Sequence, residues 1–161
     1  MLMARTSRIP DPDQALKLDH QLCFALYSTS LAITKAYRPL LDPLGLTYPQ
    51  YLVMLALWES DDLPVSALGE RVALDSGTLT PLLKRLEAAG LLQRQRDAAD
   101  ERRVLIRLTA AGRRLRSKAA GIPGCMLQAM DCSLDELAAL MRQVRVLRDR
   151  VRTTTPAPGA D

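Results

Sequence analysis

Three cysteines are the side chains of this sequence best suited to covalent chemistry. Cys23, Cys125 and Cys132 are scattered along the chain, and no two of them form a Cys-x-x-Cys pair. An odd, widely spaced set of this kind predicts neither a disulfide framework nor a zinc site. The chain has a single histidine, His20, so no metal site and no cofactor are expected. The chemistry that remains is that of individual thiols.

Cys23 lies near the N-terminus of a predicted helix, between Leu22 and Phe24. A cysteine with apolar neighbours is by default a small, unreactive core residue. Two features favour a reactive thiol: the helix dipole stabilises a thiolate at this end, and the Tyr27 hydroxyl one turn later can donate a hydrogen bond to it. Asp19, one turn earlier, opposes ionisation because its carboxylate repels a second negative charge. The local chemistry leaves both interpretations open.

A second kind of chemistry is predicted for the helix that ends at Gly90. Leucines at the i, i+3, i+4 and i+7 positions of one buried face are Leu79, Leu82, Leu83 and Leu86. The opposite face exposes groups that suit phosphates and base edges, namely Ser76, Thr78, Thr80, Lys84 and Arg85. Pro81 removes a hydrogen bond from a helix begun at Asp75, so either the first turn is distorted or the regular helix begins at Pro81.

A β-hairpin is predicted directly after this helix. The segments LLQRQR and RVLIRLT alternate in polarity and are joined by the polar DAADER. Four arginines on the hairpin suit a minor groove or flanking phosphates: Arg94, Arg96, Arg102 and Arg103. Asp100 is close enough to Arg102 to predict an ion pair that orients it. A solvated hairpin with screened ion pairs is the alternative.

Helices must position both groups of residues. The predicted helices cover about 16–39, 47–59, 65–74, 75–89, 109–122 and 133–151. Pro39 is expected to end the first, and three others are expected to be capped, by Thr47, Thr109 and Ser133. Two short helices joined by a tight turn and followed at once by a hairpin are the order of a winged helix-turn-helix, whose second helix enters a major groove. The predicted fold class is therefore mainly α with a small β-hairpin wing.

Composition agrees with one such domain. The chain has 161 residues, only 4% of them aromatic, which suits helices better than a sandwich or barrel. Its 22 Lys and Arg exceed 18 Asp and Glu, a net charge of +4 that is compatible with a polyanionic partner. No apolar run has the length of a membrane span, and the first twenty residues lack a signal-peptide segment. A cytoplasmic protein with no membrane partner is expected.

The residues from 74 to 115, LDSGTLTPLLKRLEAAGLLQRQRDAADERRVLIRLTAAGRRL, closely resemble the recognition helix and wing of MarR-type repressors. Asp100 and Arg102 begin the family pattern DxRxxxxxLT, which ends at Thr109. The segment LDHQLCFALYSTSLAITKAYRPLLDPLGLTYPQYLVMLALWE further resembles the organic hydroperoxide-sensing branch of that family, OhrR. The resemblance extends from about Leu18 to Leu147.

The resemblance implies that Cys23 is the residue oxidised by peroxide and that Tyr27 and Tyr37 engage its thiolate. It implies that a second cysteine near the C-terminus resolves the oxidised form, for which Cys125 and Cys132 are both candidates. It also implies a homodimer on a palindromic operator, with interlocked N- and C-terminal helices, and release of the DNA on oxidation.

Tyr37 lies fourteen residues after Cys23, which is about 21 Å along a helix, so any contact between them must come from an antiparallel partner subunit. We expect disordered ends at 1–14 and 152–161 and a single domain over 15–151. Within it, 15–46 and 110–151 are dimerisation helices and 47–109 are the DNA-binding lobe. Many leucines in the first helix agree with a dimer, although a larger core would also explain them.

The expected function is a redox-sensing transcriptional repressor, not an enzyme. It binds a double-stranded operator when reduced and releases it when an organic hydroperoxide oxidises Cys23. One alternative is a MarR-type repressor that responds to a small aromatic ligand, in which Cys23 is a packing residue. Another is a thiol peroxidase, in which the winged helix-turn-helix would have no role.

Overall fold

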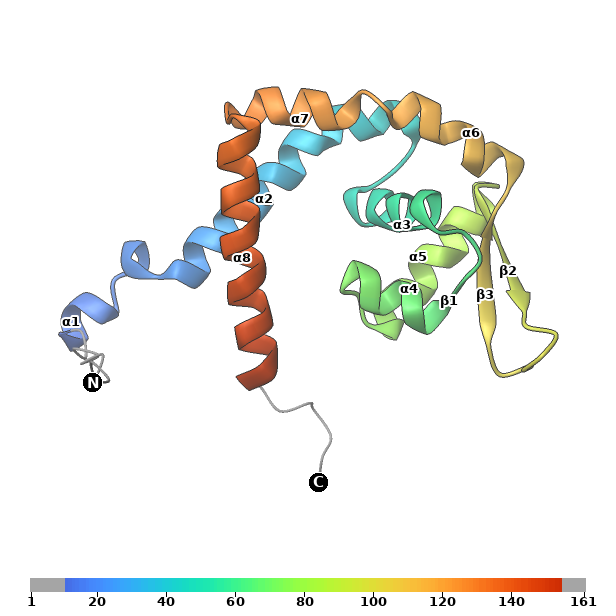
Figure 1. The fold of residues 1–161 in the computed structure, drawn as a ribbon, viewed down its shortest axis with the longest axis horizontal. Coiled ribbons are helices and arrows are strands. Elements are labelled where there is room, and N and C mark those ends of the chain that lie inside the picture. The colour runs from blue at the N-terminus through green and yellow to red at the C-terminus, as the bar shows by residue number, and fades with distance from the viewer. Residues whose placement is uncertain (1–10, 155–161) are drawn as a thin grey trace.

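The computed structural model describes residues 11–154, and Figure 1 shows how the elements follow one another. Most of them are helices and the strands form one small sheet, which confirms the predicted fold class. The first half contains α1 (Pro12–Ala15), the 3-10 turns η1 (Leu18–His20) and η2 (Asp42–Leu44), α2 (Leu22–Leu41), α3 (Tyr48–Glu59), β1 (Leu63–Pro64), α4 (Val65–Val72) and α5 (Ser76–Ala88). The second half contains β2 (Leu92–Arg96), β3 (Val104–Leu108), α6 (Ala110–Ala119), α7 (Ile122–Met130) and α8 (Leu134–Thr154).

Helix α2 begins later and ends later than the predicted helix over about 16–39. Extended backbone at Lys17 and Gln21 separates the turn η1 from α2. Pro39 does not end the helix, because a proline in the last turn removes only one backbone hydrogen bond. The N–H of Asp42 still donates to a carbonyl one turn earlier. The long helix is therefore continuous from just before Cys23 to the start of η2.

Helices α4 and α5 form the helix-turn-helix. The Asp75 carboxylate caps α5 by accepting a hydrogen bond from the N–H of Thr78 at 2.9 Å. Pro81 lies inside an uninterrupted helix, so α5 begins at Ser76 and not at Pro81. Gly90 has a φ of 73° and follows the helix end, as predicted for a residue without a Cβ.

The predicted hairpin is confirmed, and it belongs to a three-stranded sheet. Strands β2 and β3 are antiparallel with Leu92 opposite Leu108. The short strand β1 pairs with the other edge of β3, with Leu63 opposite Ile106. Sequence reasoning missed β1 because two residues, one of them a proline, show no alternation.

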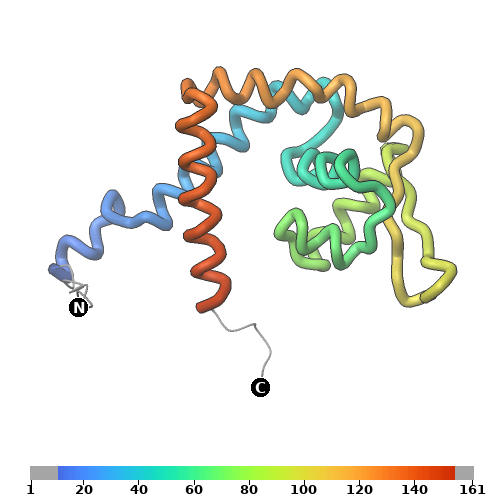
Figure 2. Tube along the Cα trace, in the orientation of Figure 1, coloured from blue at the N-terminus to red at the C-terminus, as the bar shows by residue number. Residues whose placement is uncertain are grey.

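The predicted caps of the C-terminal helices are confirmed. The Thr109 hydroxyl accepts a hydrogen bond from the Gly112 N–H at 3.0 Å at the start of α6. The Ser133 N–H donates to the Glu136 carboxylate at 2.8 Å, and the Glu136 N–H donates to the Ser133 hydroxyl at 3.2 Å. Figures 1 and 2 show α6 and α7 crossing one edge of the molecule and α8 turning sharply away from α7.

The buried core lies in the lobe formed by α3, α4, α5 and the sheet, with further contributions from the C-terminal half of α2, from α6 and from α7. Its largest fully buried side chains are Tyr51, Leu41, Met54, Leu57, Leu68, Leu79, Leu83, Leu86, Leu92, Ile106 and Val53. This core fixes α5 and the hairpin in one orientation relative to each other. The predicted buried face of α5 is therefore confirmed.

Apolar side chains on α2 and α8 remain outside this core. Helix α8 has no buried residue over its 21 positions. Large apolar side chains exposed on the two helices are Leu22, Leu26, Tyr27, Leu31, Leu134, Leu140, Met141, Val144, Val146 and Val151. An apolar surface of this extent is typical of an interface with another molecule.

Disorder was predicted for residues 1–14 and 152–161. Helix α1 includes residues 12–14, and α8 extends to Thr154. Part of each segment predicted to be disordered is therefore helical. Residues 1–10 and 155–161 lie outside the described residues. Within residues 11–154, no helix is both long enough and apolar enough to cross a membrane.

Candidate DNA-binding surface and thiol site

The polar face of α5 is exposed over the buried leucines. The exposed side chains include all five predicted contacts, Ser76, Thr78, Thr80, Lys84 and Arg85. The Thr78 hydroxyl also donates to the Asp75 carboxylate at 3.1 Å. Hydrogen bonds from the Thr78 backbone and side chain lower the pKa of Asp75, so this cap is charged at neutral pH. Thr78 therefore orders the first turn of the helix as well as facing solvent.

Arg94 on β2 is held by Glu87 in the last turns of α5. Its Nε donates to Glu87 Oε2 at 2.8 Å, and its backbone N–H donates to Oε1 at 3.0 Å. These hydrogen bonds lower the pKa of Glu87. The two residues brace the wing against the recognition helix, a role that sequence reasoning missed for this arginine.

Asp100 contacts Arg102, but the predicted ion pair between their side chains is wrong. Asp100 accepts the backbone N–H of Arg102 at 3.0 Å, so it shapes the wing turn and does not pair with the guanidinium. The ion pair at this tip joins Arg103 to Asp97 at 3.8 Å. Among residues 11–154, Arg102 has no carboxylate partner within 4.0 Å, and neither does Arg96 on β2. Both arginines are exposed and available to an anion.

The tertiary structure brings the helix and wing groups together. Thr80 of α5 and the wing residues Arg94, Arg102 and Arg103 line one hollow, with Ser66 at the start of α4. Sequence reasoning treated helix and wing as separate groups and missed Ser66. Ser66 could have been predicted, because it places a hydroxyl in the first turn of α4, directly after Pro64 and Val65.

Asp61 and Asp62 form an acidic turn. The sequence indicated only that they mark the end of the helix before them. The Asp61 carboxylate accepts the Leu108 N–H at 2.8 Å and pairs with Arg113 at 3.1 Å. Asp62 pairs with Arg107 at 2.9 Å, and this raises the pKa of the guanidinium. The turn therefore joins the end of α3 to the wing base and to α6.

The thiol of Cys23 is exposed in the described chain, at the second position of α2. Tyr27, one turn further along, has 62% of its surface exposed. Asp19 is not one turn before Cys23 on the same helix, because it lies in the separate turn η1. Cys23 and Tyr27 therefore share a face of α2 that no other part of residues 11–154 buries.

Tyr37 is far from Cys23 in its own chain, as the sequence indicated. It packs against Tyr48, with ring centroids 4.7 Å apart, and against Tyr51, at 5.7 Å. Burial, together with these two neighbouring phenols, raises the pKa of Tyr37 to about 12. The hydroxyl is therefore a hydrogen-bond donor throughout the neutral range.

The three thiols are free. Cys125 is exposed on α7, and Cys132 is half-buried between α7 and α8, where its thiol donates to the Met130 carbonyl at 3.2 Å. Among residues 11–154, no group of three His, Cys, Asp or Glu side chains is arranged to hold a metal ion.

Comparison with known proteins adds several findings. A family model described as the transcriptional regulator SarA/Rot matches residues 35–119. The organic hydroperoxide resistance transcriptional regulator of Bacillus subtilis (strain 168) is 53% identical over 125 residues, which cover 78% of this chain and 85% of that protein. The HTH-type transcriptional regulator TtmR of Methylorubrum extorquens (strain PA1) is 46% identical over 163 residues, which cover 99% of this chain and 82% of TtmR.

Solved structures share the fold. Reduced AbfR bound to DNA has a TM-score of 0.73 and 32% identity, over 86% of this chain and 97% of AbfR. AbfR, from Staphylococcus epidermidis, is also known overoxidized on DNA and with a disulfide formed. PcaV from Streptomyces coelicolor, in complex with its natural ligand, has a TM-score of 0.76 and 30% identity, over 84% of this chain and 96% of PcaV.

Proposed function

The chain belongs to the MarR family of transcriptional regulators, as an OhrR-like member, and we propose that its operator binding is switched by the redox state of Cys23. In the reduced state the protein binds a palindromic operator and represses transcription. Oxidation of Cys23 by an organic hydroperoxide releases the DNA. The relatives are transcriptional regulators and not enzymes, so the thiol peroxidase alternative is dropped.

The observation that carries this proposal is the exposed thiol at the start of α2, within the apolar surface of that helix. Leu22 and Leu26 are exposed beside it, with Tyr27 one turn away. An apolar rim favours a lipophilic oxidant over a small hydrophilic one. Two copies of the chain that bury the apolar faces of α2 and α8 would enclose this thiol between them.

The same surfaces support a homodimer. Residues 15–46 and 110–151 supply the subunit contacts, and residues 47–109 bind DNA through α5 and the wing. The phenol of Tyr37 reaches Cys23 only from a partner subunit, because α2 is continuous between the two residues. The sensing pocket is thus completed by the second chain.

The chemistry requires one peroxide and one further thiol. The Cys23 thiolate attacks the terminal oxygen of the hydroperoxide and the O–O bond breaks. The sulfur becomes a sulfenic acid that keeps the proton of the terminal oxygen, and the alkoxide leaves as the alcohol by taking up the proton that the thiol released on ionising. A second thiol, from Cys125 or Cys132, then attacks this sulfur, forms the disulfide and releases water. Both candidates are on or beside α7, so the new bond pulls on the helices that carry the DNA-binding lobes.

The test is operator binding by reduced protein before and after stoichiometric cumene hydroperoxide. The native chain should lose the DNA, and Cys23→Ser should keep it. Cys125→Ser is a control that retains the first oxidation step. Peroxide-insensitive binding by the native chain would overturn the redox proposal.

A regulator that responds to a small aromatic ligand is the second candidate. PcaV, a neighbour in fold, has been solved with its natural ligand. Here α2 and α8 border an apolar hollow of about 530 Å³ whose lining includes Leu26, Ile33, Tyr48, Leu137 and Met141. Release of DNA by an aromatic acid, equally in the native chain and in Cys23→Ser, would favour this function.

A further inference from the structure

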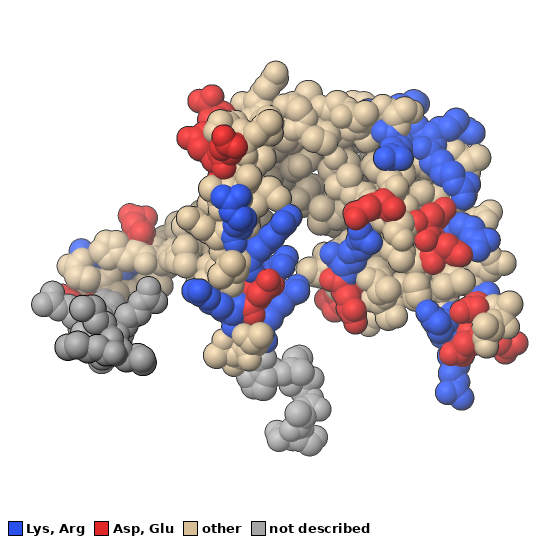
Figure 3. Space-filling model, viewed as in Figure 1, with Lys and Arg blue, Asp and Glu red and all other residues tan. Residues whose placement is uncertain are grey.

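The second half of α8 carries a cluster of positive charge that the proposed switch does not use. Its arginines are all exposed: Arg145, Arg148, Arg150 and Arg152, with Arg142 just before the middle of the helix. Figure 3 shows Lys and Arg gathered on this half of the helix, with acidic residues at its other end. Among residues 11–154, the one ion pair made by these arginines joins Arg148 to Asp149 at 2.9 Å.

Helical spacing divides the cluster between two faces. Arg145, Arg148 and Arg152 are three and four residues apart and share one face of α8. Arg150 is turned about 200° from both Arg148 and Arg152, on the other side. The apolar stripe that includes Leu140 and Val144 lies beside the three-arginine face. Burial of that stripe against a second copy therefore leaves the three arginines at its rim.

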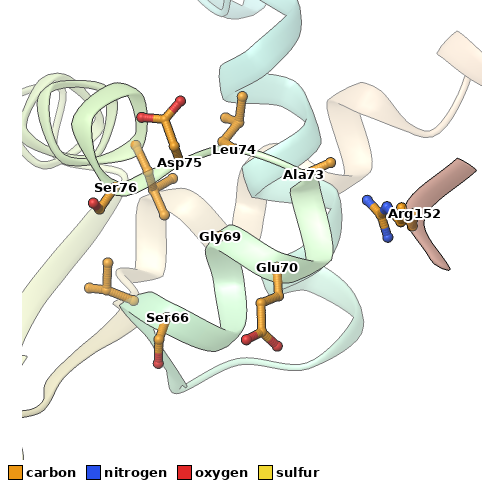
Figure 4. Close-up of a pocket in the computed structure, with 10 residues that line it drawn as sticks. Ser66, Gly69, Glu70, Ala73, Leu74, Asp75, Ser76 and Arg152 are labelled. Carbon is orange, nitrogen blue, oxygen red and sulfur yellow. The ribbon is translucent and has the colours of Figure 1, made fainter. Parts of the chain in front are cut away.

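Arg152, at the end of this face, lies beside the helix-turn-helix. It lines an open hollow of about 760 Å³ together with Ser66, Glu70 and the start of α5 at Ser76. In Figure 4 the Arg152 guanidinium points towards α4, near Ala73. Figure 1 shows that α8 stands on the opposite side of α4 and α5 from the wing. A duplex seated on α5 thus has the wing on one side and the end of α8 on the other.

We propose that Arg145, Arg148 and Arg152 bind phosphates of the operator on the side of the recognition helix opposite the wing. The inference rests on the operator binding proposed above, and in the dimer this stretch of DNA lies between the two half-sites. Guanidinium groups match phosphate oxygens in geometry and charge, and neutralising phosphates releases counterions from the duplex.

Charge balance favours DNA over the other occupant, a second α8. An antiparallel pair of these helices would set the acidic start of one against the basic end of the other. That start offers two carboxylates, Asp135 and Glu136, against five arginines, and Glu136 already accepts hydrogen bonds from Ser133. Most of the positive charge would remain without an anion.

The test compares two sets of substitutions in the full chain. Arg145→Gln, Arg148→Gln and Arg152→Gln are combined in one variant, and Arg150→Gln on the other face is the control. The probe is an operator duplex selected from random DNA by the reduced native protein. Its dissociation constant is measured across a series of salt concentrations.

The triple variant should bind at least about tenfold more weakly at 0.1 M salt, with a salt slope reduced by about 1 for each phosphate that the variant no longer neutralises. The control should change affinity by less than about threefold, and a triple Arg→Lys variant should restore the slope because the charge is kept. Hydroxyl-radical footprints should lose protection between the half-sites and keep it at the outer flanks.

An unchanged salt slope in the triple variant would overturn the inference. Dissociation of the triple variant into monomers, measured by sedimentation, would also overturn it and assign the arginines to the subunit interface. If the native protein selects no operator, the proposed function itself fails. That result is distinct, because the other two leave native operator binding intact.

Discussion

Asp62 and Arg107 form a bidentate pair across 45 residues of sequence, with Arg107 Nη2 2.9 Å from one carboxylate oxygen and Nε 3.2 Å from the other. Beside it, Asp61 accepts the Leu108 N–H and pairs with Arg113. The turn after α3 is thereby tied to strand β3 of the wing and to α6.

Asp61→Ala should destabilise the protein by about 1–3 kcal/mol, because it leaves the half-buried Leu108 N–H without its acceptor. Asp62→Asn is the matched control, because asparagine tolerates the left-handed backbone of this position and the pair with Arg107 is largely exposed and should contribute about 0.2–1 kcal/mol. Urea unfolding of both variants measures the difference. Equal losses in the free energy of unfolding would contradict the stabilising role of the hydrogen bond from the Leu108 N–H.

Gly112→Ala should disrupt the junction between α6 and the DNA-binding lobe. A Cβ at this position would lie 2.0 Å from the Leu91 carbonyl oxygen, and the Gly112 carbonyl also accepts the Trp58 indole N–H at 2.9 Å. We expect a loss of at least about 2 kcal/mol in the free energy of unfolding. Gly124→Ala in α7, where nothing lies within 4 Å, should be neutral or stabilising.

Asp75→Ala should cost about 0.5–2 kcal/mol and weaken operator binding, because the first turn of the recognition helix loses its cap. Asp75→Ser keeps a capping oxygen, so it should retain most of the stability and most of the operator affinity. The contribution of the charged cap is present above the ordinary carboxyl pKa of 3.8 and is lost as the pH falls through the lowered pKa of the folded state. Helicity and operator affinity, measured on the same samples, would separate an effect on folding from a direct effect on DNA binding.

Tyr37 should make stability fall at alkaline pH. Its pKa is raised from 10.0 to about 12 in the folded chain, so the unfolded chain loses this proton first. The contribution is fully present below pH 10 and is lost as the pH rises towards 12. Unfolding by urea across this range should show a shallower decline for Tyr37→Phe than for the native chain. Parallel curves would contradict the assignment.

Removal of both C-terminal thiols should make the switch irreversible. In a Cys125→Ser, Cys132→Ser variant, excess peroxide should drive Cys23 to a sulfinic acid, since no thiol intercepts the sulfenic acid. Mass spectrometry should find two added oxygens, and dithiothreitol should fail to restore the thiol. The single variants, compared on non-reducing gels, identify which cysteine forms the disulfide.

Local features could be predicted from the sequence because their determinants lie within one turn of each other. The Thr47 cap, the Ser133 capping box, the buried leucines of α5, the stop at Gly90 and the hairpin are of this kind. Each depends on residue type at a spacing of two to four positions. The predicted end of α2 was wrong, because Pro39 in a last turn removes too little hydrogen bonding to end the helix.

The tertiary structure decided which of these elements meet. Three contacts join residues that follow no regular spacing along the chain. They are the ion pair of Glu87 with Arg94, the ion pair of Asp62 with Arg107, and the pairing of β1 with β3. The same holds for the hollow that sets Arg152 beside the start of α5. Side-chain charge alone cannot specify such partners, since any exposed carboxylate suits any arginine. Packing of the core selects the pairs by bringing their backbones within reach.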